Sequence, residues 1–503
     1  CDAIYRGYLS LTSGVVIVPA LLVFFFVVTV VTALVGYHGI PVRDAVWVMF
    51  QTKIFATGNL TAPAPPLPEF FAARWVMHNG RWFSYTSPGH SLTLLPMTAL
   101  GVPWLTGPLL GTLSIWLTYR IAVRLYGASP GRTLLILSAT SPALIALFGS
   151  FDFHVSSVFF TVLGLYFATC SREPVGSLIA GLSLGLVFLA RPYTGLAVGL
   201  PLLIFVVLSS RQMDSKLALG KTILAAMLAF STPVVLHLLY NKAVTGNHLV
   251  FPYNLMGRVH AIGFGQDIGE PGYHGIIGHS LLRATLNTGY ALLAASFQYL
   301  GWMFFSLIPF VCAVRLPRLR RQWQLWAPGL TLVLAYFFYW CHGVTPWGPK
   351  YWSELLPSFL LISSAVFSPT AAAPLAPKAD WLGPTWRLRT AAFLIAYSLT
   401  VSLPTTLLYL ASGNWGETTK IARRVRAERI HNAIVFVHGD EQSGSLDYTS
   451  AFLFNDPFLN GDVVFARDLG EQNARLAALY PGRSYYRYDF NADSLNREEL
   501  NQL

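Results

Sequence analysis

The chain has 503 residues, of which 54% are hydrophobic and only 11% charged, and its formal net charge is +11. Soluble proteins carry about 25% charged residues, so the composition excludes an ordinary soluble protein and indicates an integral membrane protein. Much of the positive charge lies in short segments between apolar runs, as the positive-inside rule expects. It therefore argues against a nucleic-acid-binding protein.

Apolar runs of about 20 residues recur along the chain, and each is predicted to be a membrane-spanning helix. The spans are expected at about 14–36, 103–125, 131–150, 155–171, 175–191, 194–209, 219–241, 297–315, 325–341, 355–369 and 389–411. The sequence thus predicts a mainly α fold, a polytopic transmembrane helix bundle with about 11 spans.

The distribution of Lys and Arg gives the orientation. With the N-terminus in the cytoplasm, the short inner loops carry more Lys and Arg than the much longer outer loops, and such an asymmetry sets the topology of a membrane protein. We expect a multi-pass protein of a bacterial inner (plasma) membrane. The outer loops would then face the periplasm or the cell exterior.

Two outer loops are long, 37–102 and 242–296. The first contains the segment "ARWVMHNGRWFSY", whose alternating pattern around Asn79-Gly80 predicts a β-hairpin. The segment "GHSLTLLPMTALG" that follows predicts a short helix at the membrane interface. The second loop is rich in Gly around "GFGQDIGEPGYHGIIGH".

The composition changes after residue 411, and 412–503 is richer in charge. The runs "NAIVFVHG" and "GDVVFARD" are strand-like, and "EQNARLAALY" is helix-like. We predict a membrane domain over 1–411 and a small α/β domain over 412–503 on the outer face. Since no long linker joins them, the two are expected to pack together.

Acidic side chains are scarce in the predicted outer segments, and two of them directly follow a span, Asp44 and Asp152. Ionisable groups close to a membrane are costly and often functional. Each has a plain structural interpretation as well: Asp44 as a helix N-cap, and Asp152 as a solvated turn carboxylate. His154, beside Asp152, has the plain interpretation of a structural turn histidine.

Two cations are expected on the same outer side. Lys350 lies in "HGVTPWGPKYWSELLP", and Arg191 lies in "FLARPYTG" at the outer end of a span. Either could simply snorkel to the interface. Alternatively, the two could bind the phosphate of an anionic lipid, because phosphate is held by several cations where water is scarce.

Several stretches, in this order, resemble the GT-C glycosyltransferases, in particular bacterial relatives of protein O-mannosyltransferases and of the lipid A aminoarabinose transferase. They are "FQTKIFATGNLTAPAPP", "YTSPGH", "SATSPALIALFGSFDFH", "GLSLGLVFLARPYTG", "YNKAVTGNHLVFPYN" and "GPKYWSELLP". The resemblance covers most of 1–411. Two departures stand out: Ala45 follows Asp44 where the family often has a second acid, and Lys350 replaces a more usual Arg, which keeps the charge but loses bidentate geometry.

The resemblance implies an enzyme that moves a sugar from a polyprenyl phosphate to an acceptor hydroxyl on the outer side, with inversion at the sugar carbon. Asp44 would be the general base, and Asp152 would be a second acid that orients the acceptor or binds a metal. The donor phosphate would be bound by Lys350, Arg191 and Arg81. The acceptor or the sugar would be bound by His154, His90, Tyr351 and Glu354.

The expected partners are the polyprenyl-phosphate sugar, membrane lipids, and an acceptor that is a glycan, a lipid or a protein. We expect no nucleic acid. No cofactor is certain, and a divalent cation is the one candidate. A membrane transporter or lipid-linked sugar flippase is the alternative, although no internal repeat and no charged mid-span residue supports it. A second alternative is a membrane-anchored binding protein that works through 412–503.

Overall fold

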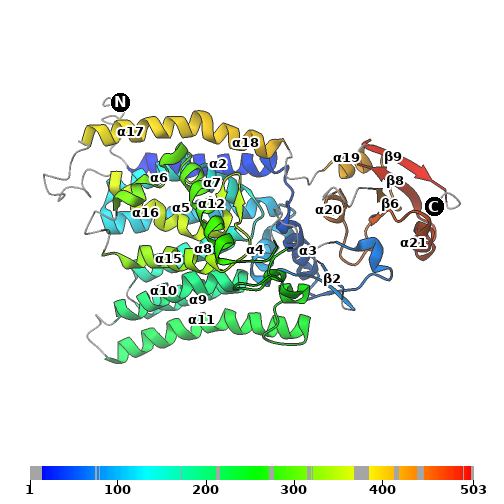
Figure 1. The fold of residues 1–503 in the computed structure, drawn as a ribbon, viewed down its shortest axis with the longest axis horizontal. Coiled ribbons are helices and arrows are strands. Elements are labelled where there is room, and N and C mark those ends of the chain that lie inside the picture. The colour runs from blue at the N-terminus through cyan, green and yellow to red at the C-terminus, as the bar shows by residue number, and fades with distance from the viewer. Residues whose placement is uncertain are drawn as a thin grey trace.

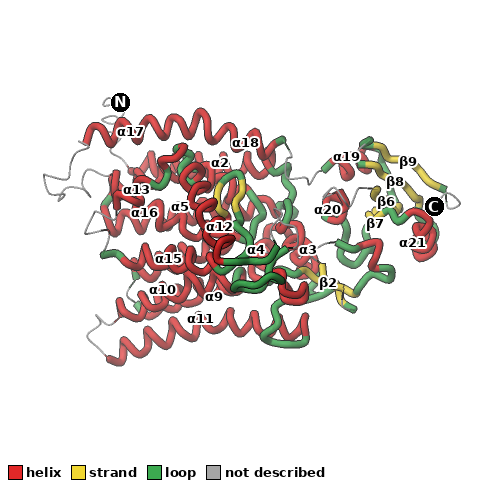
Figure 2. Tube along the Cα trace, viewed as in Figure 1, coloured by secondary structure: helices red, strands yellow, loops and turns green. Residues whose placement is uncertain are grey.

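The computed structural model describes residues 14–73, 76–78, 80–171, 173–210, 216–270, 277–313, 319, 321–367, 384–412, 419–438, 447–490 and 492–499. A bundle of helices makes up most of the molecule, and a small unit that contains a β-sheet lies at one end of it (Figure 1). The longer strands lie in that unit, as Figure 2 shows, and shorter strands lie in the rest of the described chain.

Helices occupy the apolar runs of the first half of the chain. They are α2 (Gly14–Val31, continued by η1, Thr32–Gly36), α5 (Thr106–Tyr126), α6 (Ala128–Ala139), α7 (Pro142–Gly149), α8 (His154–Cys170), α9 (Pro174–Ala190), α10 (Pro192–Ser210) and α11 (Lys216–Thr245). Pro begins α7 and α9, where its missing N–H costs no hydrogen bond.

The second half of the bundle follows after the second outer loop. It comprises α12 (Leu281–Gln298), η6 (Met303–Phe305), α13 (Ile308–Ala313), α15 (Trp323–Phe337), α16 (Leu356–Phe367), α17 (Pro384–Tyr397), η8 (Ser398–Ser402) and α18 (Leu403–Ala411). Here the sequence interpretation of 242–296 as a loop is wrong in part, because α12 starts inside it. The Ser280 hydroxyl caps α12 by accepting a hydrogen bond from the Arg283 N–H.

The described residues contain four helices that are long and apolar enough to cross a membrane. They are Val16–Gly36, Pro192–Ser209, Leu219–Thr245 and Arg389–Ala411. Two bent pairs would raise the number to six, α6 with α7 at 64° and α12 with the segment Met303–Ala313 at 111°. The helices of the described chain are therefore those of a multi-pass membrane protein. The number of about 11 spans stays a prediction.

Small residues let the helices of the bundle approach closely. A Cβ on Gly181 of α9 would lie 2.1 Å from the Ala226 carbonyl oxygen of α11, so these two helices touch along their backbones. A Cβ on Gly89 would lie 2.4 Å from the Ala190 backbone nitrogen. Gly89 therefore brings the start of the interface helix against the end of α9, next to Arg191.

The first outer loop is well structured. It contains α3 (Asp44–Ala56), β1 (Ala62–Pro63), η2 (Pro68–Phe71), β2 (Val76–His78), β3 (Arg81–Ser84), α4 (Pro88–Ala99) and η3 (Pro103–Leu105). Strands β2 and β3 pair antiparallel, with Val76 opposite Ser84. The predicted strand pair and the predicted short helix, α4, are confirmed, although Asn79 of the turn lies outside the described residues. The place of α4 at the membrane interface stays a prediction.

Near the site, η4 (Pro252–His260), the short strands β4 (Val344–Thr345) and β5 (Gly348–Pro349), and η7 (Lys350–Leu355) join the helices. The C-terminal unit consists of α19 (Lys420–Ala427), β6 (Ala433–His438), α20 (Asp447–Phe452), β7 (Val463–Arg467), η10 (Gly470–Gln472), α21 (Asn473–Leu479), β8 (Ser484–Asp489) and β9 (Ser494–Glu498).

The four strands of the C-terminal unit form one sheet in the order β7-β6-β8-β9. Strand β6 runs parallel to both β7 and β8, while β9 pairs antiparallel with β8. This arrangement confirms the predicted α/β character of the C-terminal region, because parallel strands need crossover connections such as the helices between them. The boundary at residue 411 stays a prediction.

Candidate active site

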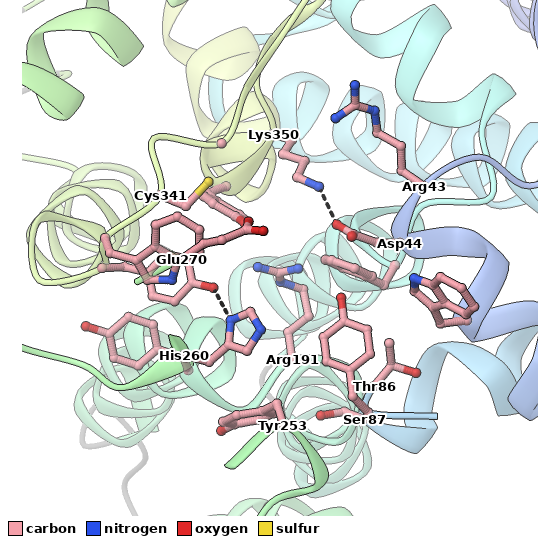
Figure 3. Close-up of a pocket in the computed structure, with 18 of the residues that line it drawn as sticks. Arg43, Asp44, Thr86, Ser87, Arg191, Tyr253, His260, Glu270, Cys341 and Lys350 are labelled. Carbon is pink, nitrogen blue, oxygen red and sulfur yellow. Dashed lines mark hydrogen bonds and ion pairs between the residues drawn. The ribbon is translucent and has the colours of Figure 1, made fainter. Parts of the chain in front are cut away.

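A pocket of about 850 Å³ lies where one end of the helix bundle meets the loops that are predicted to face outward (Figure 3). Its wall is built from segments that are far apart in the chain: the start of α3, the link from β3 to α4, the junction of α9 and α10, η4, and the stretch from α15 to η7. Of the predicted site residues, Asp44, Arg191, Lys350 and Tyr351 line it.

Asp44 is the first residue of α3 and points into this pocket (Figure 3). The N-cap position of the helix is occupied by Arg43, which makes no side-chain capping hydrogen bond, so the structure differs from the interpretation of Asp44 as the cap. Arg43 has a φ of 51°, a conformation that non-glycine residues rarely adopt and that often occurs at functional sites. This sharp turn of the backbone directs the carboxylate toward the pocket.

Lys350 donates a hydrogen bond of 2.7 Å from Nζ to Oδ2 of Asp44, and the two form an ion pair. The Asp44 side chain is 29% exposed and the Lys350 side chain 14%. Burial alone would raise the pKa of Asp44, but the charge and hydrogen bond of Lys350, together with the charges of Arg43 and His260, hold that pKa below its usual value. Burial would lower the pKa of Lys350, and the charge of Asp44 raises it instead.

Arg191 is fixed beside this pair by side chains of the bundle. Its guanidinium donates to the Tyr336 hydroxyl at 2.6 Å and to the Thr194 hydroxyl at 3.1 Å. It also lies 4.4 Å from the centre of the Phe153 ring and 5.5 Å from that of Tyr351.

Lys350 Nζ lies 5.6 Å from the centres of the same two rings, Phe153 and Tyr351. The structure therefore brings together the two predicted phosphate-binding cations, Lys350 and Arg191, over one pair of aromatic faces. Cation–π contacts of this kind hold a cation in place without neutralising its charge.

Asp152 faces the same region from the other side. A small cavity of about 30 Å³, large enough for a water molecule, adjoins the pocket and is lined by Asp152, Asp44 and Lys350 among others. One carboxylate oxygen of Asp152 accepts a hydrogen bond from the His154 N–H at 3.1 Å. Asp152 thus lies near the predicted base but outside the main pocket.

His154 and Glu354 are brought together, but away from the pocket. Nδ1 of His154 and Oε1 of Glu354 are 3.0 Å apart, and both side chains are fully buried. Burial raises the pKa of Glu354 to about 7, although the charge of Arg191 opposes the shift. Because neither side chain lines the pocket, the geometry gives no support to a direct contact with sugar or acceptor.

His90 and Arg81 lie elsewhere. The ring of His90 is buried and hydrogen-bonded to the Ser156 hydroxyl and the Phe151 carbonyl oxygen, both at 3.0 Å. Arg81 donates to the Ala243 carbonyl oxygen at 2.7 Å. Neither lines the pocket, so the sequence interpretation of these two as substrate ligands has no geometric support.

The pocket also contains residues that the sequence analysis did not select. Nδ1 of His260, in η4, is hydrogen-bonded to the Tyr339 hydroxyl at 2.9 Å (Figure 3). Burial lowers the pKa of His260, although the charge of Asp44 opposes the shift. Tyr85 and, from the C-terminal unit, Tyr448 line the same pocket. Tyr85 belongs to the quoted stretch "YTSPGH" but was not selected as a site residue, while His260 and Tyr448 lie outside the quoted stretches.

Within the part of the chain that the structure describes, no three His, Cys, Asp or Glu side chains lie together in a way that could hold a metal ion. The ammonium of Lys350 lies against Asp44, the acid that such an ion would need most. These described residues do not fit a metal site.

Comparisons with known proteins bear on the fold. Residues 102–236 match the family model described as Dolichyl-phosphate-mannose-protein mannosyltransferase, and residues 435–499 match the one described as Domain of unknown function (DUF7846). No curated protein sequence matches the chain.

Among solved structures, the chain is similar to ArnT from Cupriavidus metallidurans in the apo state, with a TM-score of 0.55, 13% identity, and coverage of 97% of this chain and 93% of that one. It is also similar to ArnT from the same organism bound to undecaprenyl phosphate, with a TM-score of 0.53, 14% identity, and coverage of 94% and 92%. At such identities the likeness establishes the fold. The chain has the GT-C glycosyltransferase fold, related to that of ArnT, which confirms the resemblance seen in the sequence.

Proposed function

We propose that the chain is a lipid-phosphate-dependent glycosyltransferase that moves a sugar from a polyprenyl phosphate to an acceptor hydroxyl on the outer face of the membrane. One observation carries the proposal: an acid, Asp44, opens into a pocket beside two clustered cations, Lys350 and Arg191. The family model named for dolichyl-phosphate-mannose transfer and the ArnT structure bound to undecaprenyl phosphate support the donor class.

In the proposed reaction, the acceptor hydroxyl attacks the anomeric carbon of the sugar from the side opposite the phosphate. Asp44 takes the hydroxyl proton, the new carbon–oxygen bond forms, and the bond from carbon to the phosphate oxygen breaks. The phosphate oxygen leaves with the electron pair, so the product is a polyprenyl phosphate and the sugar carbon is inverted. Lys350 and Arg191 stabilise the negative charge that develops on the leaving phosphate.

The ion pair between Asp44 and Lys350 sets a condition on this chemistry. A carboxylate that is held by an ammonium is a weak base, and Lys350 keeps the pKa of Asp44 low. The donor phosphate offers Lys350 a second anion and so weakens its hold on Asp44. We therefore expect Asp44 to become a better base once the donor is bound.

Asp152 is proposed to support the pair of Asp44 and Lys350. Its position across the small cavity from Asp44 and Lys350 suits a water-mediated contact with the pair. There it would keep Lys350 charged and oriented. The acceptor class, the cell compartment and the topology of the membrane part remain those expected from the sequence: a glycan, lipid or protein acceptor on the outer side of a bacterial plasma membrane.

The test is donor turnover in detergent. Purified protein is given a panel of polyprenyl-phosphate sugars with an extract of cell-envelope acceptors, and release of polyprenyl phosphate is measured. We expect release by the native chain and a loss of about 10²–10⁴-fold for Asp44→Asn, the usual contribution of a general base.

Asp267→Asn is the matched control for this test, because Asp267 pairs with Arg258 on an exposed outer loop and does not line the pocket. Equal release by the native chain and Asp44→Asn would remove Asp44 from the chemistry. If the native chain binds undecaprenyl phosphate but releases none from any donor, a flippase becomes the better description, and transport in liposomes would decide it.

A further inference from the structure

The C-terminal unit reaches the pocket of the membrane part. Three of its residues line that pocket, Tyr448 and Thr449 of α20 and Arg467 at the end of β7. All three can form hydrogen bonds with a ligand. The pocket is therefore formed by both parts of the chain, and the sheet-containing unit at the end of the bundle (Figure 1) supplies one of its walls.

An aromatic cluster fixes α20 on the first outer loop. The ring of Phe452 lies 5.6 Å from Trp47, 5.2 Å from Phe50 and 5.6 Å from Trp82. These side chains are all nearly fully buried. They belong to a single hydrophobic core that also includes Phe436 of β6, so the outer loop and the C-terminal unit fold against each other as one body.

A half-buried cation strengthens the same contact. Lys53 near the end of α3 donates from Nζ to the carbonyl oxygens of Leu453 at 2.6 Å and Asn455 at 3.0 Å. Burial lowers the pKa of Lys53 to about 8. In turn, the Asn455 side chain exchanges two hydrogen bonds of 2.8 Å with the backbone of Phe465 in β7.

Helix α3 connects the C-terminal part of the pocket lining to the proposed base, Asp44. Helix α3 begins with Asp44 and ends near Lys53, so the same helix carries the carboxylate and holds α20 and β7. The cations proposed to bind the donor phosphate, Lys350 and Arg191, come instead from η7 and the junction of α9 and α10. The bundle thus contributes the two cations of the pocket, and the C-terminal unit contributes further polar side chains to its lining.

We propose that the C-terminal unit is the acceptor-binding wall of the active site, where Tyr448, Thr449 and Arg467 bind a polar, hydroxyl-bearing acceptor and present its hydroxyl to Asp44. This inference rests on the proposed function and assigns a role to the region that matches a domain of unknown function. A wall fixed by Phe452 and Lys53 keeps the acceptor in one orientation relative to the base, which is what an attack on a single carbon needs.

The test adds bulk to this wall after the protein has folded. In a background where the four cysteines, Cys1, Cys170, Cys312 and Cys341, are replaced by Ser, Thr449→Cys is purified and modified with maleimides of increasing size. Two quantities are measured: transfer to the acceptor extract that supports turnover by the native chain, and the affinity for undecaprenyl phosphate. Asn496→Cys is the matched control, because Asn496 is exposed on β9 in the same unit.

We expect modification at position 449 to reduce transfer at least tenfold, more strongly with larger reagents, while undecaprenyl phosphate affinity stays within twofold. Modification at position 496 should change neither quantity. Unchanged transfer after complete modification at 449 would overturn the inference, and so would an equal loss of undecaprenyl phosphate binding, which would assign the wall to the donor. Failure of the native chain to turn over any donor would instead refute the proposed function, so the two failures are distinguishable.

Discussion

Two carboxyl groups in neighbouring regions of this molecule are each paired with a basic side chain, but they differ in their access to the pocket. Asp44 and Lys350 are 2.7 Å apart at the pocket surface, with the Asp44 side chain 29% exposed. Glu354 and His154 are 3.0 Å apart in the layer behind it, with both side chains fully buried. The two groups also differ in their pKa, which lies below its usual value for Asp44 and near 7 for Glu354. The first pair can meet a substrate, whereas the second is placed to hold the site in position.

The two pairs share the elements that position them. Lys350 and Glu354 both belong to η7, which therefore presents a cation to the pocket and a carboxyl group to the interior. On the other side, Asp152 and His154 flank the start of α8. The buried pair thus ties η7 to α8 just behind the two cations, and we regard Glu354 and His154 as positioning residues for Lys350.

The largest contrast is expected when each carboxyl group is changed to an amide. Asp44→Asn should reduce turnover about 10²–10⁴-fold, because the base is lost. Glu354→Gln should reduce it less than about tenfold, because the amide can still form a hydrogen bond with Nδ1 of His154, as donor or as acceptor. Turnover at saturating donor measures both. A larger loss for Glu354→Gln than for Asp44→Asn would reverse the roles that we assign.

Replacing Lys350 tests two of its effects separately: its proposed contact with the donor phosphate, and its effect on the pKa of Asp44. Lys350→Met should weaken binding of undecaprenyl phosphate about 10- to 150-fold, as expected from loss of a charge-assisted hydrogen bond of about 1.5–3 kcal/mol. Without Lys350, burial is less opposed and the pKa of Asp44 should rise, so the acid limb of the pH–rate profile should move to higher pH. Lys242→Met is the control, since that exposed amine bonds to the Gly246 carbonyl oxygen instead. An unchanged acid limb would show that Lys350 does not set the pKa of Asp44.

The buried carboxyl group of Glu354 should make the free energy of unfolding depend on pH. The pKa of Glu354 is about 7 in the folded protein and 4.5 ordinarily, so the folded state keeps this proton over a range where the unfolded state loses it. Stability from this group is therefore complete below about pH 4.5 and decreases as pH rises toward 7, by on the order of 3 kcal/mol at most. Thermal unfolding in detergent from pH 4.5 to 8 measures it. Glu354→Gln should flatten the curve, and an identical pH dependence for native and variant chains would contradict this.

The smallest effect on binding of undecaprenyl phosphate is expected at Arg81, which belongs to neither of the two pairs. Arg81→Gln should leave undecaprenyl phosphate affinity within twofold, because Arg81 bonds to the Ala243 carbonyl oxygen and does not line the pocket. Arg191→Gln, compared in the same binding assay, should weaken binding at least tenfold. A strong effect of Arg81→Gln would mean that the first outer loop rearranges when the donor binds.

The sequence predicted the centre of the site better than its edges. Asp44, Lys350, Arg191 and Tyr351 all follow or precede predicted spans at the end of the bundle that the hydropathy pattern and the charges of the loops place outward, and the structure brings the four to one pocket. The sequence could not tell which side chains on that face point inward. His90 and Glu354 lie on the correct side of the bundle but are buried in the protein rather than in the pocket.

Long-range docking accounts for most of what was missed. Tyr448 and Thr449 lie about 400 positions from Asp44 in the chain, and only the packing of Phe452 on Trp47 brings them to it. Helix α12 was missed for another reason: Arg283, Asn287 and other polar residues dilute its hydropathy, so the predicted span began only at its end. The docking of α20 has no local sequence signal, and hydropathy alone does not detect α12.

The most direct test of the central claim replaces the base and supplies a nucleophile that needs none. Asp44→Ala is incubated with a polyprenyl-phosphate sugar and sodium azide, and both the released lipid phosphate and the sugar product are analysed. The account predicts that azide restores polyprenyl phosphate release and yields a glycosyl azide with inverted anomeric configuration, while Asp44→Ala without azide stays inactive. No restoration by azide in a variant that still binds undecaprenyl phosphate, or a product with retained configuration, would contradict the role of Asp44 as the general base of an inverting transfer.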